Sequence, residues 1–304
     1  MSELVKNRSE ILFLYDVTDA NPNGDPVDEN KPRIDEETGV NIVTDVRLKR
    51  TIRDYLHEYK KQDVFIREIR DETGNLKTKE DRLKDFKNDP EAVIGKCIDI
   101  RLFGATTAVE NQTMALTGPV QFKYGRSLHK IDLTYIKGTT VMPSAAEKRQ
   151  GTFTERYILP YSLIAFYGIV NENAAENQKM ELTEGDVSLM VEGIWNGTKN
   201  LISGSKFGQM PRLLIQVVYK EGNFYIGELD KRISLVSDID GEEIRNISEV
   251  KIDITNLINA LSDHKDKIEK IKLKVDDRIM FIKDGQDIKI ENALSGFKVE
   301  FLDF

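Results

Sequence analysis

Cationic side chains gather in one short stretch of the sequence, at a spacing that suits phosphate binding. In the segment that starts at Thr44, TDVRLKRTIRDYLHEY, the apolar residues recur at helical spacing; they are Leu48, Ile52, Tyr55, Leu56 and Tyr59. The basic residues fall on the remaining arc; they are Arg47, Lys49, Arg50 and Arg53. This pattern predicts an amphipathic helix with a cationic outer face, able to contact phosphates. A solvated basic helix without a ligand is the alternative.

A Gly/Ser-rich loop offers a second set of groups for a nucleic-acid backbone. Ser203, Ser205, Lys206 and Gln209 lie in the stretch SGSKFGQ, where hydroxyls, amides and an ammonium group suit phosphate and sugar. Arg126 follows a predicted strand. Aromatic residues interleave with these charges and can stack on bases; they are Tyr124, Phe153, Tyr157 and Phe207.

Acidic residues cluster in a long early loop, where Mg²⁺ binding by carboxylate oxygens has to be weighed. The cluster consists of Asp16, Asp19, Asp25 and Asp28. Proline and glycine residues break the same segment into turns, where Asp and Asn are common for backbone reasons. We expect turn chemistry here, and a metal site is the alternative.

Other catalytic signatures are absent from the sequence. The three histidines, His57, His129 and His264, have no metal-ligand spacing. No nucleophile elbow, phosphate-binding loop or dinucleotide fingerprint occurs. Cys97 is the single cysteine, which excludes a disulfide framework and a thiolate cluster, and we expect it to be buried. We therefore expect a protein that is not an enzyme and has no cofactor or metal.

The formal net charge of −8 opposes nucleic-acid binding only if the charge is evenly spread. Residues 44–70 carry +3, 118–170 carry +4 and 195–220 carry +4, whereas 1–43 and 221–304 carry −6 each. A folded chain can gather the three basic blocks into one groove. No apolar run of about 18 residues is present, so no membrane span is expected. The polar start favours the cytoplasm.

The elements that position these residues can be predicted in outline. We expect strands at Ile11–Tyr15, 98–103, 119–124, 131–137, 157–170 and 213–219. The second clear helix begins at Thr183, with Asp186 completing a capping box. From 222 on, we expect a strand hairpin (224–236), a helix (255–268) and terminal strands. Helices inserted twice between strands indicate an α+β fold with a ferredoxin-like or RRM-like core carrying large insertions.

Several segments resemble the backbone-subunit family of type I CRISPR Cascade complexes. They are DVTDANPNGDP from Asp16, PRID from Pro32, VTDVRLKRTIRDY from Val43, RLFGA from Arg101, TGPVQF from Thr117 with Arg126 and Ser127, and YILPY from Tyr157. The stretch GTKNLISGSKFGQMPR from Gly197 points to the type I-B, Csh-two-like branch of the Cas7 family. The resemblance covers about two-thirds of the chain and is most specific in its N-terminal block.

The resemblance implies a modified RRM core, called the palm, with insertions forming fingers and a thumb. On this basis residues 1–304 form one domain, with finger-like insertions at 18–43 and 60–95. From its own residues, the charged stretch 60–92, with an Asp-Glu-Thr-Gly-Asn turn from Asp71, reads as a hairpin or flexible insertion. The thumb loop spans 138–155, and residues 220–304 add strands and a helix packed on the core. The implied role is a crRNA-binding subunit that polymerises along the guide and presents it to target DNA in antiviral defence. Its partners are further copies of itself and other Cascade subunits, of the Cas five and large-subunit families.

The resemblance also gives roles to particular residues. Lys49 and Arg50 match the family's RNA-contacting helix, to which helix geometry adds Arg47 and Arg53. Arg33 and Gln121 lie in matched segments, and Met142 is a candidate wedge between bases, with a plain loop or interface role as its alternative. Type I members are not expected to cut RNA. A metal-dependent endoribonuclease of the related type III kind, using Asp16, Asp19 or Asp25, is the rival function, and a protein-only scaffold is a third.

Overall fold

The computed structural model describes residues 3–109, 112–139 and 153–304. Its strands are β1 (Ser9–Ala20), β2 (Gly24–Asp25), β3 (Lys31–Pro32), β4 (Val40–Val43), β5 (Gly104–Val109), β6 (Gln112–Thr117), β7 (Val120–Phe122), β8 (Gly125–Lys130), β9 (Thr134–Thr139), β10 (Phe153–Val170), β11 (Gln209–Tyr219), β12 (Ser234–Val236), β13 (Lys251–Asp253), β14 (Ile268–Val275), β15 (Phe281–Lys283), β16 (Gln286–Ile288) and β17 (Val299–Phe301). Its α-helices are α1 (Asp45–Glu58), α2 (Lys79–Lys84), α3 (Pro90–Lys96), α4 (Ile98–Phe103), α5 (Glu172–Asn177), α6 (Glu184–Lys199), α7 (Thr255–Asp263) and α8 (Ile290–Ala293). Four 3₁₀ turns lie at Leu229–Arg232, Gly241–Glu243, Ile247–Glu249 and Lys265–Lys267. None of the helices in these ranges is long and apolar enough to cross a lipid bilayer.

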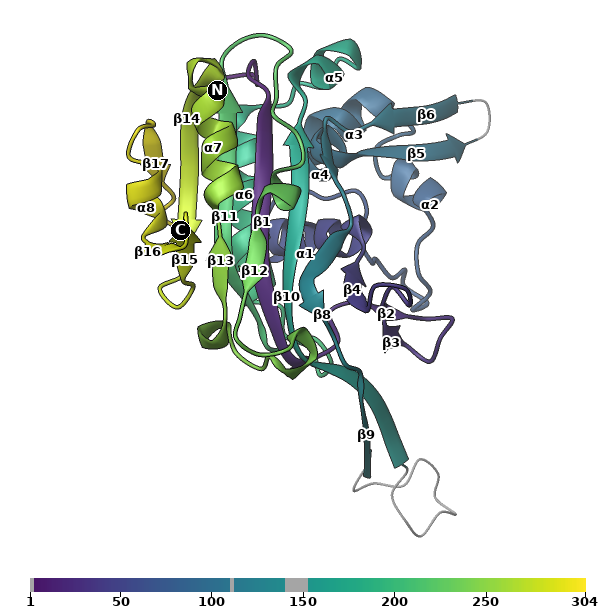
Figure 1. The fold of residues 1–304 in the computed structure, drawn as a ribbon. Coiled ribbons are helices and arrows are strands. Elements are labelled where there is room, and N and C mark those ends of the chain that lie inside the picture. The colour runs from purple at the N-terminus through teal and green to yellow at the C-terminus, as the bar shows by residue number, and fades with distance from the viewer. Residues whose placement is uncertain (1–2, 110–111, 140–152) are drawn as a thin grey trace.

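A mixed sheet in the order β17-β14-β11-β1-β10-β8-β4 forms the centre of the α+β fold (Figure 1). Its four middle strands, β11-β1-β10-β8, are antiparallel neighbours. Along the chain α1 follows β1 and α6 follows β10. This connection order is that of a β-α-β-β-α-β unit, with α1 and α6 in contact with each other.

Both faces of this sheet are buried. Alternate side chains of β1 enter two different cores, because successive residues of a strand point to opposite faces. Leu12 and Leu14 lie in the core that is covered by α7 and the segment around Ile247. Ile11 and Phe13 lie in the core covered by α1 and α6. In Figure 1, α7 crosses one face and α1 and α6 lie behind the other. These core strands therefore have no exposed sheet face on which nucleic-acid bases could stack.

The strands predicted at Ile11–Tyr15, 157–170 and 213–219 are confirmed, and both β1 and β10 extend well beyond the predicted limits. The two predicted long helices are confirmed as α1 and α6. The strand predicted at 98–103 is wrong, because these residues form α4. The stretch expected to be a loop at 138–155 has strand residues at both ends, Gly138–Thr139 in β9 and Phe153–Glu155 in β10. Other limits also differ: α7 ends at Asp263, and in the hairpin expected at 224–236 a 3₁₀ turn at Leu229–Arg232 precedes the single strand β12.

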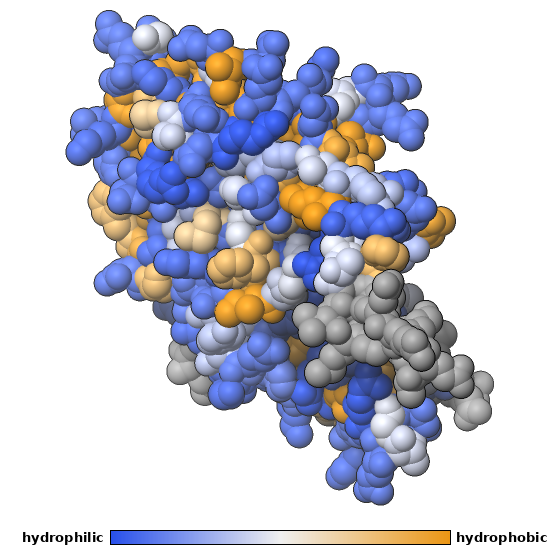
Figure 2. Space-filling model, turned by 90° about the horizontal axis from the view of Figure 1, so that it is seen from below, coloured by the Kyte–Doolittle hydropathy of each residue, from blue (hydrophilic) through white to orange (hydrophobic). Residues whose placement is uncertain are grey.

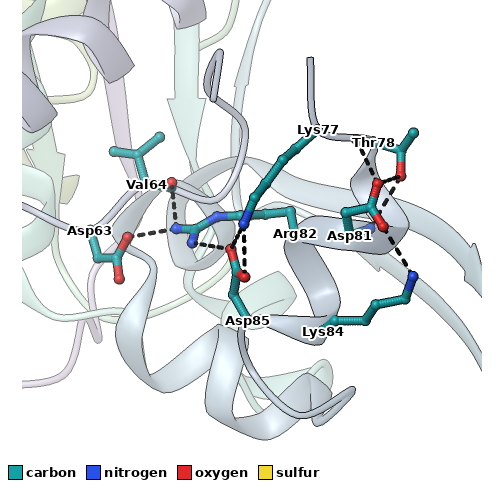
Figure 3. A network of polar contacts seen from close by, with 8 residues as sticks. All are labelled: Asp63, Val64, Lys77, Thr78, Asp81, Arg82, Lys84 and Asp85. Atoms are coloured by element: carbon teal, nitrogen blue, oxygen red, sulfur yellow. Dashed lines mark hydrogen bonds and ion pairs between the residues drawn. The ribbon is translucent and has the colours of Figure 1, made fainter. Parts of the chain in front are cut away.

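The segment expected to be a hairpin or flexible insertion at 60–92 contains α2 and the start of α3. A tight turn closes the bridge between Arg70 and Leu76, as the Asp-Glu-Thr-Gly-Asn signal predicts. Beyond this turn, Arg82 joins α2 to the segment after α1, because it donates to the Asp63 carboxylate at 2.8 Å and to the Val64 carbonyl at 3.2 Å (Figure 3). These polar contacts surround a small apolar core of their own, which includes Cys97. The buried position predicted for this cysteine is confirmed.

The capping box at the start of α6 predicts a measurable contribution to stability. The Thr183 hydroxyl accepts from the Asp186 amide at 3.1 Å, and the Asp186 carboxylate accepts from the Thr183 amide at 3.2 Å. We expect Thr183→Ala to lower the free energy of unfolding by about 1 kcal/mol, because the first turn loses an acceptor. Urea denaturation measures the change. Thr183→Ser keeps the hydroxyl and should unfold like the unsubstituted protein, so equal losses in both variants would contradict the capping role.

Candidate nucleic-acid interface

Three segments far apart in the sequence meet at the end of β1. The Thr18 amide donates to the Gly208 carbonyl at 3.1 Å, and the Asn21 amide donates to the Ser205 carbonyl at 2.7 Å. Gly208 has a φ of +101°, and a Cβ at this position would lie 2.6 Å from the Thr18 carbonyl oxygen. Only glycine fits both the backbone angle and the close approach. The Gly/Ser-rich loop is therefore fixed against β1.

The loop that follows β1 folds back onto the start of α1. The side-chain oxygen of Asn23 accepts from both the amide and the hydroxyl of Thr44, each at 2.8 Å. Arg33 holds the same turn by donating to the Gly24 carbonyl at 2.7 Å. The Asp25 carboxylate accepts from the Val27 amide at 3.0 Å, a side-chain turn of the kind the sequence predicts. Turn chemistry thus places the start of α1 beside the Gly/Ser-rich loop.

Two cations, Arg47 and Lys206, lie near enough at this junction for their charges to interact. Lys206 donates to the Asn21 carbonyl at 3.1 Å, and Arg47 donates to the Thr51 hydroxyl at 2.9 Å. Both side chains are half-buried. Burial, and secondarily the nearby Arg47 charge, lowers the pKa of Lys206 to about 8. Burial also lowers the pKa of Arg47. The two basic blocks at 44–70 and 195–220 therefore do come together at this point.

The two cations lack acidic partners in the described part of the chain. No carboxylate lies within ion-pair distance of Arg47 or Lys206 there, and the buried Nε of Arg47 has no acceptor. Two partly desolvated positive groups held side by side are unfavourable unless an anion joins them. A phosphate oxygen would satisfy both by charge-assisted hydrogen bonds. We name Arg47 and Lys206 the cation pair.

The cationic outer face predicted for α1 is wrong for two of its four residues. Lys49 is buried and bonds Asp45 at 2.9 Å and the Gln121 amide oxygen at 3.2 Å. Arg53 is buried and bonds the fully buried Asp99 at 2.9 Å. Both cations are neutralised by partners from within the fold. The helix buries a wider arc than its apolar stripe because Phe103 of α4 and Gln121 of β7 contact it.

The other predicted contacts are spread over the surface. Arg50 is exposed and paired with Asp54 at 2.8 Å, and Arg126 is exposed and paired with Asp35 at 2.9 Å. Arg33 lies 3.5 Å from Asp25. Ser203 is exposed and Ser205 half-exposed beside the cation pair, whereas Gln209 is buried and donates to the Lys206 carbonyl. Met142 lies outside the described residues.

Two residues of this junction were not predicted from the sequence. Arg156, on β10, donates to the Gly204 carbonyl at 3.0 Å and ties the Gly/Ser-rich loop to the β9–β10 hairpin. Asn21 is buried and contacts both Ser205 and Lys206 through its backbone. In the sequence, Asn21 precedes a proline in a segment predicted to form turns, and this pattern gives no sign of its contacts with the Gly/Ser-rich loop. The hairpin itself projects from the body of the molecule (Figure 1).

The end of the molecule that carries the hairpin has a mixed surface. Seen from below, hydrophobic residues form small separate patches between hydrophilic ones on this face (Figure 2). Tyr135 and Phe153 on the hairpin, and Phe207 beside the cation pair, are exposed. Exposed aromatic rings near cations are typical of surfaces on which nucleic-acid bases stack.

The aspartates required for the nuclease alternative do not converge. Asp16 is buried and bonded to Arg212 at 2.8 Å and to the Tyr161 hydroxyl at 3.2 Å. Asp25 serves the turn described above, and Asp19 is exposed. No group of three His, Cys, Asp or Glu side chains is placed to hold a metal within residues 3–109, 112–139 and 153–304.

Comparisons with known proteins test the family resemblance and the fold. The family model of the CRISPR-associated protein Cas7 matches residues 7–255. A CRISPR-associated protein Cas7 from Haloferax volcanii is 34% identical, over 90% of this chain and 88% of that protein. The fold is similar to a chain of a solved CRISPR RNA-guided surveillance complex in a pre-nicking state, with TM-score 0.59, 12% identity and coverage of 97% and 96% of the two chains. A chain of another CRISPR RNA-guided surveillance complex gives TM-score 0.56 at 14% identity, covering 96% and 94%.

Proposed function

The chain belongs to the CRISPR-associated Cas7 family, and from this we propose that it is a crRNA-binding backbone subunit of a Cascade-type surveillance complex. Copies of the chain polymerise along the guide and present it for pairing with target DNA. The segment that resembles the Csh-two-like branch supports a type I-B complex. Further copies of itself and the other Cascade subunits, of the Cas five and large-subunit families, are its partners.

The cation pair is the single observation that carries this proposal. Arg47 and Lys206 lie beside a loop of backbone amides and hydroxyls and have no carboxylate partner in the described residues. Such a site holds a phosphate without regard to the base attached to it. A guide-holding subunit needs this property, because base pairing reads the sequence.

The covered sheet also supports the proposal. In an ordinary RRM, aromatic residues on the open sheet face stack on bases. Here α7 and its neighbouring segments bury that face, so RNA has to run along its edge and loops. We infer that the β-α-β-β-α-β unit is a modified RRM-type palm, that residues 18–43 and 60–95 act as fingers, and that the β9–β10 hairpin carries the thumb. Residues 220–304 complete the palm.

Binding of single-stranded RNA at graded salt tests the proposal. We expect the full chain to bind unrelated RNA sequences with similar affinity. The affinity should fall steeply as salt rises, by a slope of about 0.7 for each phosphate contact. Fluorescence anisotropy measures both properties. A chain that purifies free of nucleic acid, binds no RNA and still forms filaments of normal length would instead be a protein-only scaffold.

The lowered pKa of Lys206, about 8, makes the affinity depend on pH. A phosphate favours the charged lysine, so RNA binding takes up a proton where the free lysine is neutral. Between pH 8 and pH 9 the affinity should therefore fall by about fivefold as pH rises. Oligoadenylate is the suitable probe, since its bases do not titrate in this range. Lys206→Arg should remove the dependence, and an equal decline in both proteins would contradict this origin.

A further inference from the structure

A cavity of about 530 Å³ opens beside the cation pair, between the base of the β9–β10 hairpin and the Gly/Ser-rich loop. Asn21, Ser205, Ile136 and Tyr157 are among the residues that line it. Asn21 and Ser205 both adjoin Lys206, because the lysine bonds the Asn21 carbonyl and follows Ser205 in the chain. A group bound in this cavity is therefore a direct neighbour of a phosphate on the cation pair.

The charged lining of the cavity is acidic on balance, because Asp19, Glu29 and Glu155 supply three carboxylates and Arg156, which already donates to the Gly204 carbonyl, supplies one cation. The side-chain oxygen of Asn21 has no donor among the described residues, although Asn21 is only 2% exposed. Its amide nitrogen already donates to the Asn30 carbonyl at 2.6 Å, which fixes the direction of the oxygen. Asp19 and Glu29 add carboxylates, and Glu29 accepts from the Tyr157 hydroxyl at 2.9 Å. A phosphate is disfavoured where three carboxylates outnumber one cation, whereas a neutral hydroxyl donor is favoured.

From this we propose that the cavity takes the ribose of the nucleotide whose phosphate lies on the cation pair, and that Asn21 accepts a hydrogen bond from its 2′-hydroxyl. This inference rests on the proposed RNA-binding function and adds to it a means of selecting RNA over DNA. The 2′-hydroxyl is the group by which a protein distinguishes the two at a given site. Ile136 and Tyr157 supply an apolar wall for the sugar carbons.

A ribose fits this position better than a basic side chain from a partner protein. The carboxylates of the cavity attract any donor, cationic or neutral. However, a lysine or arginine placed there would add a further positive charge to those of Arg47, Lys206 and Arg156, and like charges close together repel. A neutral hydroxyl attached to a bound phosphate avoids that repulsion. In one nucleotide, the phosphate neutralises the cation pair and the ribose hydroxyl donates to the acceptors of the cavity.

Modified oligonucleotides test the inference on the unsubstituted full chain. We compare three short single strands of one sequence, carrying 2′-hydroxyl, 2′-fluoro or 2′-deoxy sugars. The fluoro sugar keeps an RNA-like conformation but cannot donate a hydrogen bond. We expect the hydroxyl form to bind about tenfold more tightly than both others, as the loss of one buried hydrogen bond allows. Equal affinity of the hydroxyl and fluoro forms would overturn the role of the hydroxyl.

The Asn21→Leu variant locates the effect. We expect it to bind RNA about tenfold more weakly and DNA unchanged, so that the preference disappears. Asn173→Leu, on α5 at the opposite end of the molecule, serves as the control and should keep the preference (Figure 1). Thermal unfolding shows whether each variant is folded. If Asn21→Leu does not fold, the comparison of the three modified strands on the unsubstituted chain tests the role of the 2′-hydroxyl. An equal loss of affinity of Asn21→Leu for RNA and for DNA would overturn only the recognition of the sugar. If the unsubstituted chain binds none of the strands, the proposed RNA-binding function is overturned as well.

Discussion

Arg47→Ala is expected to bind single-stranded RNA roughly tenfold to hundredfold more weakly than the unsubstituted chain. Hydrogen bonds to charged groups are worth about 1.5–3 kcal/mol, and Arg47 has no carboxylate partner in the described residues to weaken its contact with phosphate. The loss should be similar for all RNA sequences. The salt slope should become shallower by about 0.7, the contribution of one phosphate contact to a single strand. Anisotropy titrations at several salt concentrations measure both changes.

Arg50→Ala is the matched control for this variant. Arg50 lies on the same helix, is exposed and is already paired with Asp54 at 2.8 Å. Its removal should change the affinity by less than about fivefold, because Asp54 already neutralises its charge and an exposed contact of this kind is worth at most about 1 kcal/mol. Equal losses for Arg47→Ala and Arg50→Ala would show that α1 acts through its overall charge. The cation pair would then not be the phosphate site.

The contrast between these two arginines explains how far the sequence predicts the site. Helical periodicity predicts α1 and four of the five residues of its apolar stripe correctly, because the stripe depends on residues close together in the chain; Tyr59, which follows the helix, is exposed. Periodicity does not predict which cations of the helix remain without a carboxylate partner. The partners of Lys49 and Arg53 include Gln121 and Asp99, which lie in later segments. Burial of charge is therefore a tertiary property that no single helix reveals.

The misassigned segment 98–103 has a related cause. Ile98, Ile100 and Leu102 alternate with polar residues, which predicts a strand, and a short apolar run does not distinguish a strand from a helix. The fold settles the choice through Asp99. Its carboxylate accepts from Arg53 and from the amides of Phe65 and Ile66, at 2.7 and 3.1 Å for the two amides. The long-range partners of one buried carboxylate thus outweigh the local pattern.

Family resemblance and local chemistry together predicted Lys206 and Ser205 as contacts, but not their assembly with Arg47. That assembly depends on Gly208, whose backbone angle and close approach to Thr18 bring the loop against β1. The turn residue Asn23, bonded to Thr44, brings the start of α1 to the same place. The individual residues are readable from the sequence, whereas the junction requires the three-dimensional path of the chain.

Arg212→Ala is expected to lower the free energy of unfolding by about 3–5 kcal/mol. Arg212 bonds Asp16 at 2.8 and 3.1 Å and Asp276 at 2.5 Å, and it joins β1 to the end of β14. Its removal leaves the buried Asp16 without a cation, which costs far more than the loss of an exposed pair. Chemical denaturation at neutral pH measures the change. Arg50→Ala, which breaks an exposed pair, should change stability by less than about 1 kcal/mol.

The pH dependence of this loss separates a structural role of Asp16 from a metal-binding one. Burial raises the pKa of Asp16, while Arg212 and the Tyr161 hydroxyl oppose the rise. Without Arg212 the pKa rises further, and a carboxyl whose folded pKa is raised gains stability as pH falls and loses it as pH rises. The deficit of Arg212→Ala should therefore shrink when the pH is lowered from about 8 to about 5. If Asp16 instead holds a divalent cation, added Mg²⁺ should restore the stability of the variant at pH 8. Restoration by Mg²⁺ without an effect of acid would revive the nuclease alternative, whereas an effect of acid alone makes Asp16 part of the scaffold that supports the interface.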